Sequence, residues 1–207
     1  MKEQFGNITL YNADCMDILR ELPDKQFDLA IVDPPYGISV NPNMGIKRGQ
    51  SKRHKNIKWD DNIPPPAYFD ELFRVSSNQI IWGGNYFPLP PCRHFIFWDK
   101  MNPQGLSFSD GEMAWTSFSK AIRKVCLNNT YAGKIHPTQK PVALYKWLLA
   151  NYAKPGDRIL DTHGGSMSSA IAAHDMGFEM TIIEKDLEYY TTARRRLQWH
   201  QAQQKLF

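Results

Sequence analysis

The chain of 207 residues has few cysteines and lacks any long apolar run. Cys15, Cys92 and Cys126 are odd in number and far apart, which argues against a disulfide framework and against a zinc site. No apolar run approaches the ~18 residues needed to span a bilayer, and the first residues lack the apolar stretch of a signal peptide. We therefore expect reduced thiols, no bound metal, no membrane segment and a cytoplasmic location.

Two nucleotide-binding signatures are also missing. No Walker-type lysine follows the glycine pair Gly164 and Gly165, which argues against a nucleoside triphosphate as ligand. The pattern G-x-G-x-x-G is absent as well, which counts against NAD. The overall composition is ordinary, with 42% hydrophobic residues and a net charge of +4, so the length predicts one large domain over residues 1–207.

The most informative local feature is the turn formed by Asp33, Pro34, Pro35 and Tyr36. It follows an apolar run at 27–32, and two prolines cannot continue a central strand because they lack the N–H that the ladder needs. A carboxylate, a carbonyl and an aromatic ring are thus expected at the carboxyl edge of a sheet, where ligands bind in α/β proteins. The Asp33 carboxylate and the Pro34 carbonyl can accept both hydrogens of an NH2 group on a planar ring. The alternative is a plain proline-rich turn with a capping aspartate.

A second turn follows the strand predicted at 158–161. It comprises Asp161, Thr162, His163, Gly164, Gly165 and Ser166, and its paired glycines let a ligand approach the backbone. Glu184 lies nineteen positions after Gly165, at the end of the next predicted strand. An acidic residue at this spacing often accepts hydrogen bonds from ribose hydroxyls, so the pattern predicts a cofactor that carries a nucleoside. The alternative is a glycine-softened turn with an acid there by chance.

The order of predicted elements indicates the fold class. Apolar patterns predict seven strands and five helices, and the strand–helix–strand–helix order of the last third is typical of a parallel sheet with right-handed crossovers. The strands are expected at 8–12, 27–32, 79–82, 94–98, 112–116, 158–161 and 178–184, and the helices at 16–22, 67–76, 142–152, 168–176 and 187–201.

Basic residues gather in one stretch. The region 37–66 is long and rich in loop-forming residues, and we expect it to be a mobile loop. It can bind nucleic acid through several phosphate contacts or be a solvated loop, and its position just after the Asp33 turn favours nucleic acid. Its basic residues are Lys47, Arg48, Lys52, Arg53, Lys55 and Lys58. A second run, residues 194–196, is expected to form a solvated face of the last helix.

Taken together, the two turns and their order resemble the S-adenosylmethionine-dependent amino-methyltransferases that act on DNA, in their permuted beta class. Three further segments are similar to motifs of that family: residues 12–15, 136–141 and 183–186. The resemblance implies a Rossmann-like methyltransferase fold, S-adenosylmethionine as cofactor, and the Asp33–Tyr36 turn as the catalytic segment. It implies cofactor contacts from Asp14, Cys15, Asp33, Thr138, Gln139, Lys140, Asp161, His163, Gly164, Gly165, Ser166, Glu184 and Lys185.

The chain departs from the family pattern at three positions of the cofactor turn. Thr162 and His163 stand where the family usually has proline and phenylalanine, and Met167 stands where it has glycine. The resemblance favours adenine N6 in DNA as the acceptor, with Tyr36 stacked on a base that is unpaired or flipped out. Cytosine N4, an RNA substrate, an inactive nucleic-acid-binding subunit, a homodimer and a link to a restriction enzyme stay open.

Overall fold

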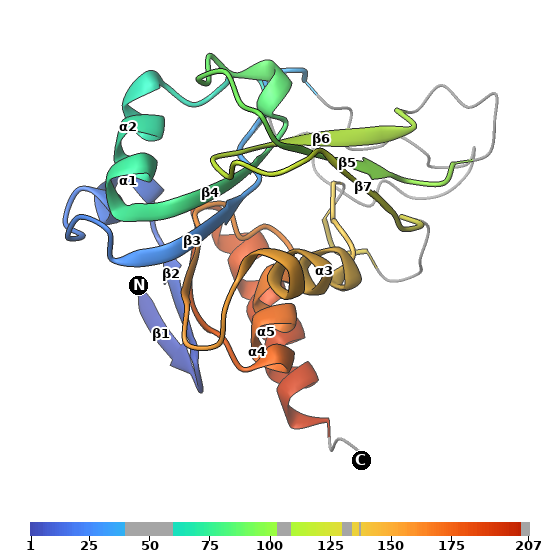
Figure 1. The fold of residues 1–207 in the computed structure, drawn as a ribbon. Helices are drawn as coiled ribbons and strands as arrows, with labels where there is room; N and C mark the ends of the chain where they lie inside the picture. The colour runs from blue at the N-terminus through green and yellow to red at the C-terminus, as the bar shows by residue number, and fades with distance from the viewer. Residues whose placement is uncertain (40–59, 103–108, 130–133, 137, 204–207) are drawn as a thin grey trace.

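The computed structural model describes residues 1–39, 60–102, 109–129, 134–136 and 138–203. Strands and helices alternate along most of the chain (Figure 1). The strands are β1 (Lys2–Phe5), β2 (Ile8–Asn12), β3 (Phe27–Val32), β4 (Ser76–Trp82), β5 (Phe95–Asp99), β6 (Gly111–Thr116), β7 (Arg123–Cys126), β8 (Arg158–Asp161) and β9 (Glu179–Glu184). The helices are α1 (Cys15–Leu19), α2 (Pro66–Val75), α3 (Val142–Tyr152), α4 (Ser168–Met176), α5 (Leu187–Ala202) and the 3₁₀ turn η1 (Gly84–Tyr86).

All described strands join one sheet in the order β1-β2-β9-β8-β3-β4-β6-β5-β7. The central five, from β2 to β4, are parallel to one another, and β6 runs antiparallel between β4 and β5. The first residue of β6 therefore lies at the same edge as the last residues of β3 and β4. This edge is where ligands bind in open α/β sheets.

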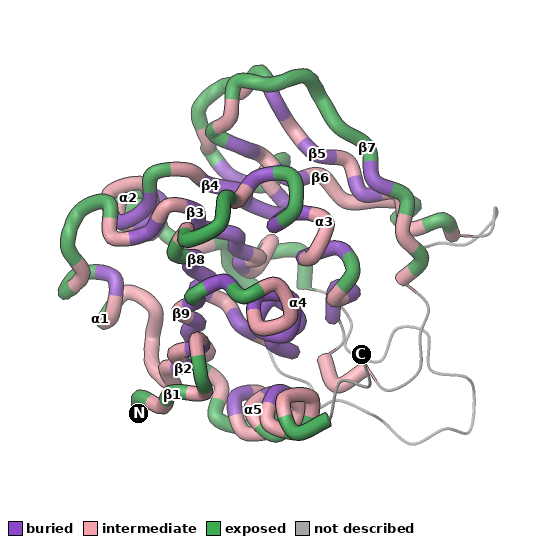
Figure 2. Tube along the Cα trace, turned by 60° about the horizontal axis from the view of Figure 1, so that its bottom comes forward, coloured by how far each residue is buried: buried purple, intermediate pink, exposed green. Residues whose placement is uncertain are grey.

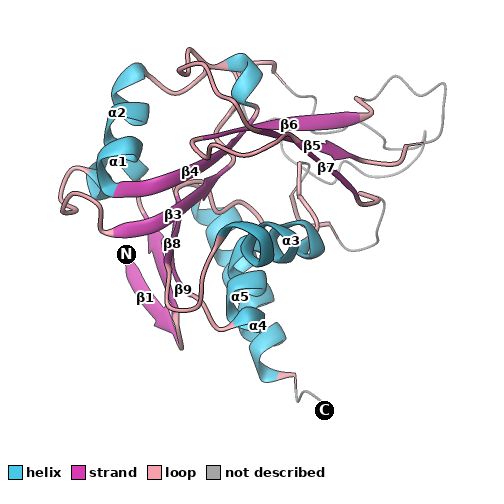
Figure 3. Ribbon diagram, in the orientation of Figure 1, coloured by secondary structure: helices cyan, strands magenta, loops and turns pink. Residues whose placement is uncertain are grey.

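Helices cover both faces of the sheet (Figure 3). On one face α1 and α2 pack through residues such as Leu19, Tyr68 and Leu72, and on the other α3, α4 and α5 pack through residues such as Leu144 and Ala170. The central strands are buried between these two layers, whereas the loops at the strand ends are more exposed (Figure 2). Strands buried on both faces need apolar residues at successive positions, which explains the unbroken run Leu29–Val32 in β3.

The expected α/β fold and its mostly parallel sheet are confirmed, but the predicted number of seven strands is wrong. Among the described residues the sheet has nine strands, because β1 and β7 extend its two edges. Neither edge strand has an apolar run: β1 alternates between exposed and half-buried residues, and β7 buries only Val125. Charged residues on short edge strands discourage pairing with other chains, and they also conceal such strands from pattern analysis. No helix in the described part of the chain is long and apolar enough to cross a membrane.

Candidate active site

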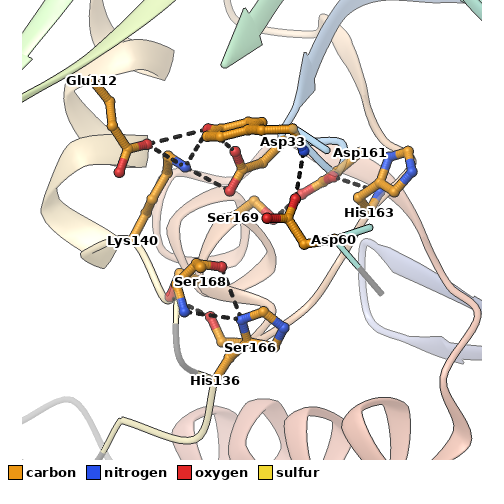
Figure 4. Close-up of polar contacts among 12 residues, drawn as sticks. Asp33, Asp60, Glu112, His136, Lys140, Asp161, His163, Ser166, Ser168 and Ser169 are labelled. Atoms are coloured by element: carbon orange, nitrogen blue, oxygen red, sulfur yellow. Dashed lines mark hydrogen bonds and ion pairs between the residues drawn. The ribbon is translucent and has the colours of Figure 1, made fainter. Parts of the chain in front are cut away.

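The Asp33 and Asp161 turns lie next to each other in the structure. Strands β3 and β8 pair in parallel, with Leu29 opposite Ile159 and Ala30 opposite Leu160. Both strands end at the same edge, and the close-up shows Asp33 and Asp161 there together (Figure 4). A single site can therefore be built from the two turns, as the sequence predicted.

The Asp33 carboxylate is held by two donors. Lys140 Nζ donates to Oδ2 at 2.6 Å, and the Tyr36 hydroxyl donates to Oδ1 at 2.6 Å. Lys140 precedes α3, and its side chain is only 2% exposed. Burial raises the pKa of Asp33, repulsion from Glu112 adds to this, and the Lys140 ammonium opposes it. Asp33 is thus paired with the Lys140 ammonium, and its carboxylate oxygens keep lone pairs that can accept a hydrogen bond from a further donor.

Glu112, at the start of β6, completes this cluster. Its Oε2 lies 2.8 Å from Lys140 Nζ, and its Oε1 lies 2.7 Å from Lys100 Nζ. Burial alone would raise the pKa of Glu112, but the two ammonium groups lower it to about 2. Burial is also the largest influence on Lys140, yet the two carboxylates raise its pKa. Glu112 and Lys140 are therefore a charged pair at neutral pH.

Tyr36 is fixed by packing and by its backbone. Its ring stacks on Tyr86, with centroids 5.1 Å apart and an interplanar angle of 16°. Gly83 lies so close that a Cβ there would be 2.2 Å from the Tyr36 ring. The buried Asp60 accepts hydrogen bonds from the backbone N–H groups of Tyr36 (2.6 Å) and Gly37 (3.2 Å), and its carbonyl accepts one from Ser39 N–H at 3.1 Å. Asp60 therefore ties the end of the 37–66 region to the Asp33 turn.

The second turn is braced by Asp161. Its Oδ1 accepts a hydrogen bond from His163 N–H at 3.0 Å, and its Oδ2 accepts one from Ser169 Oγ at 2.6 Å. Burial raises the pKa of Asp161 to about 7, and the nearby Asp33 and Glu184 add to the rise. Met167, which replaces the family's glycine, adopts a left-handed conformation with φ +54° and is fully buried. The turn therefore keeps a backbone conformation that glycine adopts readily, with an apolar side chain in the core.

His163 is held by a short chain of hydroxyl groups. Tyr68 OH lies 2.6 Å from Thr162 Oγ1, which lies 2.9 Å from His163 Nδ1. The Tyr68 ring also meets the imidazole edge-on, with centroids 5.4 Å apart. Burial lowers the pKa of His163 to about 4, against a weaker opposing effect of Asp14. Neutral His163 is thus a packing residue, which suits its position where the family usually has phenylalanine.

We expect His163 to stay neutral throughout the physiological range. Its folded-state pKa lies below the value of about 6.5 of a free imidazole, so protonation opposes folding and stability is lost as pH falls from about 6.5 towards 4. The imidazole Cε1–H resonance should titrate near pH 4 in an NMR titration of the free protein. A His163 midpoint above pH 6 would contradict the burial described here.

Glu184 lies at the tip of β9, beside Asp161 on β8. Its Oε2 accepts a hydrogen bond from Gly165 N–H at 2.7 Å, and its Oε1 accepts one from Asp186 N–H at 2.8 Å. Burial raises the pKa of Glu184, while these backbone donors oppose the rise. The carboxylate is thereby fixed beside the glycine turn, where a ribose was expected.

Asp14 follows β2, the strand beside β9, and it caps α1 and contacts the Glu184 segment. Its side chain accepts a hydrogen bond from Met16 N–H at 2.9 Å and forms an ion pair with Lys185 at 2.8 Å. Cys15 begins α1, and burial raises the pKa of its thiol to about 12. Cys15 can therefore line the site but cannot act as a nucleophile at neutral pH.

The segment before α3 closes over the glycine turn. The His136 ring packs on Tyr189 with centroids 4.4 Å apart, and its Nδ1 lies 3.1 Å from Thr138 Oγ1. Gln139 is buried and accepts a hydrogen bond from Ile135 N–H through its Oε1. In this structure Thr138 and Gln139 thus brace their own segment, whereas Lys140 extends to Asp33.

Sequence reasoning missed several residues of the site. Arg196 donates to Ser166 O at 2.6 Å and to Ser168 Oγ at 3.1 Å, so the expectation of a solvated face fails for it. Glu112 and Asp60 gave no signal, since neither belongs to a motif. Tyr68 and Tyr86 also went unnoticed, because they lie between the motifs. The structure places Asp33, Asp161 and Glu184 at one edge, with Lys140 on Asp33, Gly165 on Glu184 and Lys185 on Asp14. The predicted nucleic-acid contacts Lys47, Arg48, Lys52, Arg53, Lys55 and Lys58 lie outside the described residues.

Comparison with protein families adds the deciding observation. Residues 90–195, about half of the chain, match the N6/N4 family described as DNA methylase. The chain belongs to the DNA methylase family. The matched region contains Glu112, Lys140, Asp161 and Glu184, so most of the site lies within it.

Two curated DNA methylase relatives are type II methyltransferases. M2.DpnII of Streptococcus pneumoniae is 31% identical over 159 residues, which cover 75% of this chain and 54% of that protein. The match thus spans about half the length of this relative. M2.MboI of Moraxella bovis is 22% identical over 92% of this chain and 87% of its own length.

Solved structures confirm the methyltransferase fold. The M1.HpyAVI–SAM complex has a TM-score of 0.64 with 22% identity, and the match covers 91% of this chain and 99% of that chain. PvuII DNA methyltransferase, titled cytosine-N4-specific, has a TM-score of 0.66 with 13% identity, covering 99% of this chain and 89% of that chain. At these sequence identities the similarity shows the fold only, so the reaction must be inferred from the residues of the site.

Proposed function

We propose that this DNA methylase transfers a methyl group from S-adenosylmethionine to the exocyclic N6 amine of adenine in DNA. The observation that carries the proposal is the adjacency of the Asp33 turn and the glycine turn with Glu184, on the neighbouring strands β3, β8 and β9. One turn offers acceptors for an amino group, and the other offers a carboxylate for a ribose. Their adjacency would let an amine meet a methyl donor.

The residues present fit S-adenosylmethionine. Asp161 is buried, Asp33 and Glu184 are half-buried, and loss of solvent raises the pKa values of all three carboxylates. Such a cluster favours a ligand that carries positive charge, as a sulfonium does. A Cβ at Gly165 would have no neighbour closer than His136 at 3.8 Å, so there is room over the turn. Asp161, Gly164, Gly165, Ser166 and Glu184 would hold the nucleoside end.

Other residues would complete the cofactor site. Asp14, Cys15 and Lys185 lie on the far side of Glu184, where an adenine would extend, and His163 would pack on it as an uncharged ring. Thr138, Gln139 and Lys140 would close the methionine end. When bound, the cofactor supplies an electrophilic methyl group on sulfur.

The protein's own part in the reaction is to hold and orient the amine. The lone pair of the amine nitrogen is delocalised into the base, so the amine is a weak nucleophile. We propose that the Asp33 carboxylate and the Pro34 carbonyl accept its two hydrogens and so favour a pyramidal nitrogen that presents its lone pair to the methyl group. The nitrogen must then lose one proton, and Asp33 is the nearest acceptor of the turn. Pro35 fixes the turn.

The base must leave the stack of a duplex or come from an unpaired strand. We propose that it takes the place of the Tyr86 ring against Tyr36, because Tyr86 is 44% exposed and belongs to a single 3₁₀ turn. The basic residues between 47 and 58 would contact the phosphate backbone, since their segment leaves and re-enters the described structure beside the Asp33 turn. A homodimer and a genetic link to a restriction enzyme remain proposals of the same kind.

The test is a methyl-transfer assay with radiolabelled S-adenosylmethionine. Short duplex DNA, single-stranded DNA and RNA would be compared as acceptors, and the products digested to nucleosides. We expect N6-methyladenine from DNA. Recovery of N4-methylcytosine would show that the acceptor is cytosine and not adenine. Label in RNA would show that RNA is the substrate. No label in any acceptor would favour an inactive binding subunit.

A mutation of Glu184 tests the cofactor half of the site. Glu184→Gln keeps the shape but weakens acceptance of ribose hydroxyls, and we expect the Kd for S-adenosylmethionine to rise roughly tenfold, the effect of about one charge-assisted hydrogen bond. Isothermal titration calorimetry measures it directly. Glu179→Gln, at the opposite end of the same strand and exposed, is the matched control and should bind as the wild type does. Unchanged binding by Glu184→Gln would place the ribose elsewhere.

A further inference from the structure

Lys140 lies between two carboxylates that come from distant parts of the chain. Its ammonium is 2.6 Å from Asp33 Oδ2 and 2.8 Å from Glu112 Oε2, and its side chain is 2% exposed (Figure 4). The Tyr36 hydroxyl, 3.2 Å from both Lys140 Nζ and Glu112 Oε2, closes the cluster. Four groups thus fix one another's positions around the predicted catalytic carboxylate.

We propose that Glu112 is a positioning residue for methyl transfer: it anchors Lys140, and Lys140 in turn orients the Asp33 carboxylate and maintains its negative charge. The proposal rests on the proposed function, because it concerns how Asp33 is kept fit to accept the amine. Neither family resemblance nor the sequence motifs assign Glu112 a role. It reaches the site because β6 is antiparallel, which brings its first residues to the edge where β3 ends.

The charges explain why such an arrangement is needed. A buried carboxylate tends to take up a proton, and a protonated Asp33 would lose acceptor capacity towards an amine. Lys140 counters this tendency, and a second carboxylate beside its ammonium fixes the direction from which that ammonium meets Asp33. It lies 5.7 Å from the Tyr36 ring centroid and 5.3 Å from that of Trp82. Glu112 supplies the second charge that holds it there, and Lys100 balances Glu112 on its other oxygen at 2.7 Å.

The ionisable groups that face Asp33 define the expected pH behaviour. They are Tyr36 from the same turn, Glu112 from β6, Lys140 from the segment before α3, Asp161 from β8 and Tyr68 from α2. Of these, only Lys140 is a cation, and Glu112 is the carboxylate that shares it. Removing Lys140 should therefore raise the pKa of Asp33. Neutralising Glu112 should lower it, because the repulsion from Glu112 is lost while Lys140 keeps its contact with Asp33 at 2.6 Å.

The pKa of Asp33 should thus shift in opposite directions in the Lys140 and Glu112 variants, and this difference can be measured. Activity needs ionised Asp33, so the acid limb of the kcat/KM–pH profile follows its pKa. We expect the midpoint of this limb to fall by about one pH unit in Glu112→Gln and to rise by about one unit in Lys140→Met. Lys146→Met removes a similar ammonium, 2.7 Å from Asp175 on the α3–α4 side, and should leave the profile unchanged. A merely structural role for Glu112 would lower activity without moving the midpoint.

A second measurement does not depend on turnover. The side-chain carboxyl ¹³C resonance of Asp33, identified with Asp33→Asn, gives its titration in the free protein. Should Lys140→Met fail to fold, Glu112→Gln alone decides. A midpoint for Asp33 that is unchanged or higher in Glu112→Gln overturns the inference, as does a Lys140→Met variant whose defect is a higher Kd for S-adenosylmethionine with an unshifted profile. Loss of the proposed function is recognised separately, since the wild-type protein would then transfer no methyl group.

Discussion

Asp33→Ala is expected to lower the rate of methyl transfer by about a thousandfold while leaving the fold intact. The carboxylate is the acceptor that the proposed reaction requires at the amine, and removing one preorganised electrostatic partner typically costs a factor of about 10²–10³. The fold should survive because Lys140 keeps its contact with Glu112 at 2.8 Å, so no buried charge is left without a partner. Single-turnover rates and the thermal midpoint measure the two effects separately.

The matched control is Asp175→Ala. Asp175 likewise accepts a lysine ammonium at 2.7 Å and its side chain is 11% exposed, but it lies near the end of α4 remote from the glycine turn. Its replacement should leave turnover near the wild-type rate. If Asp33→Ala turned over at a rate close to that of Asp175→Ala, the catalytic assignment of the Asp33 turn would be wrong.

Gly83→Ala is expected to produce the second-largest loss, of roughly a hundredfold in kcat/KM. A Cβ at this position would lie 2.2 Å from Tyr36 Cε1, so the ring must move and carry its hydroxyl away from Asp33. Displacing a group of the site by about an ångström can cost about 10²-fold in rate. The residue also has φ +69°, which adds about 1 kcal/mol of backbone strain for a side-chain-bearing residue.

Gly6→Ala separates the backbone strain from the collision. Gly6 has a similar φ of +61°, but a Cβ there would meet nothing within 4 Å. It should lower the thermal midpoint by a few degrees and leave turnover unaffected. Comparable losses of activity in Gly6→Ala and Gly83→Ala would show that the contact with Tyr36 does not matter for the reaction.

The part of the site that sequence could predict is the part made at the ends of parallel strands. Asp33, Asp161 and Glu184 each follow or end an apolar run, and the carboxyl ends of parallel strands meet at one edge. Their meeting therefore followed from strand order alone. Glu112 could not be found this way, because its position depends on the reversed direction of β6, which the pattern of residues 111–116 does not encode.

Other misses have different physical causes. The strands β1 and β7 are short edge strands with charged residues, so they lack the apolar run that reveals a central strand. Arg196 was expected to be solvated because it lies in a run of three arginines, yet the helix period turns it towards Ser166 while Arg195 is exposed. The identity of a hydrogen-bonding partner thirty residues away is a property of packing, which no local pattern contains.

The anchoring of Asp60 to the Tyr36 turn has a consequence for how this fold can vary in sequence. Ser39 and Asp60 are joined by a hydrogen bond of 3.1 Å, so the chain between them departs from and returns to one point. Lengthening a connection of this kind costs little free energy when its two ends are already joined. The connection could therefore be exchanged for another while the sheet keeps its register, so the proposed contacts with nucleic acid could change without altering the Asp33 turn.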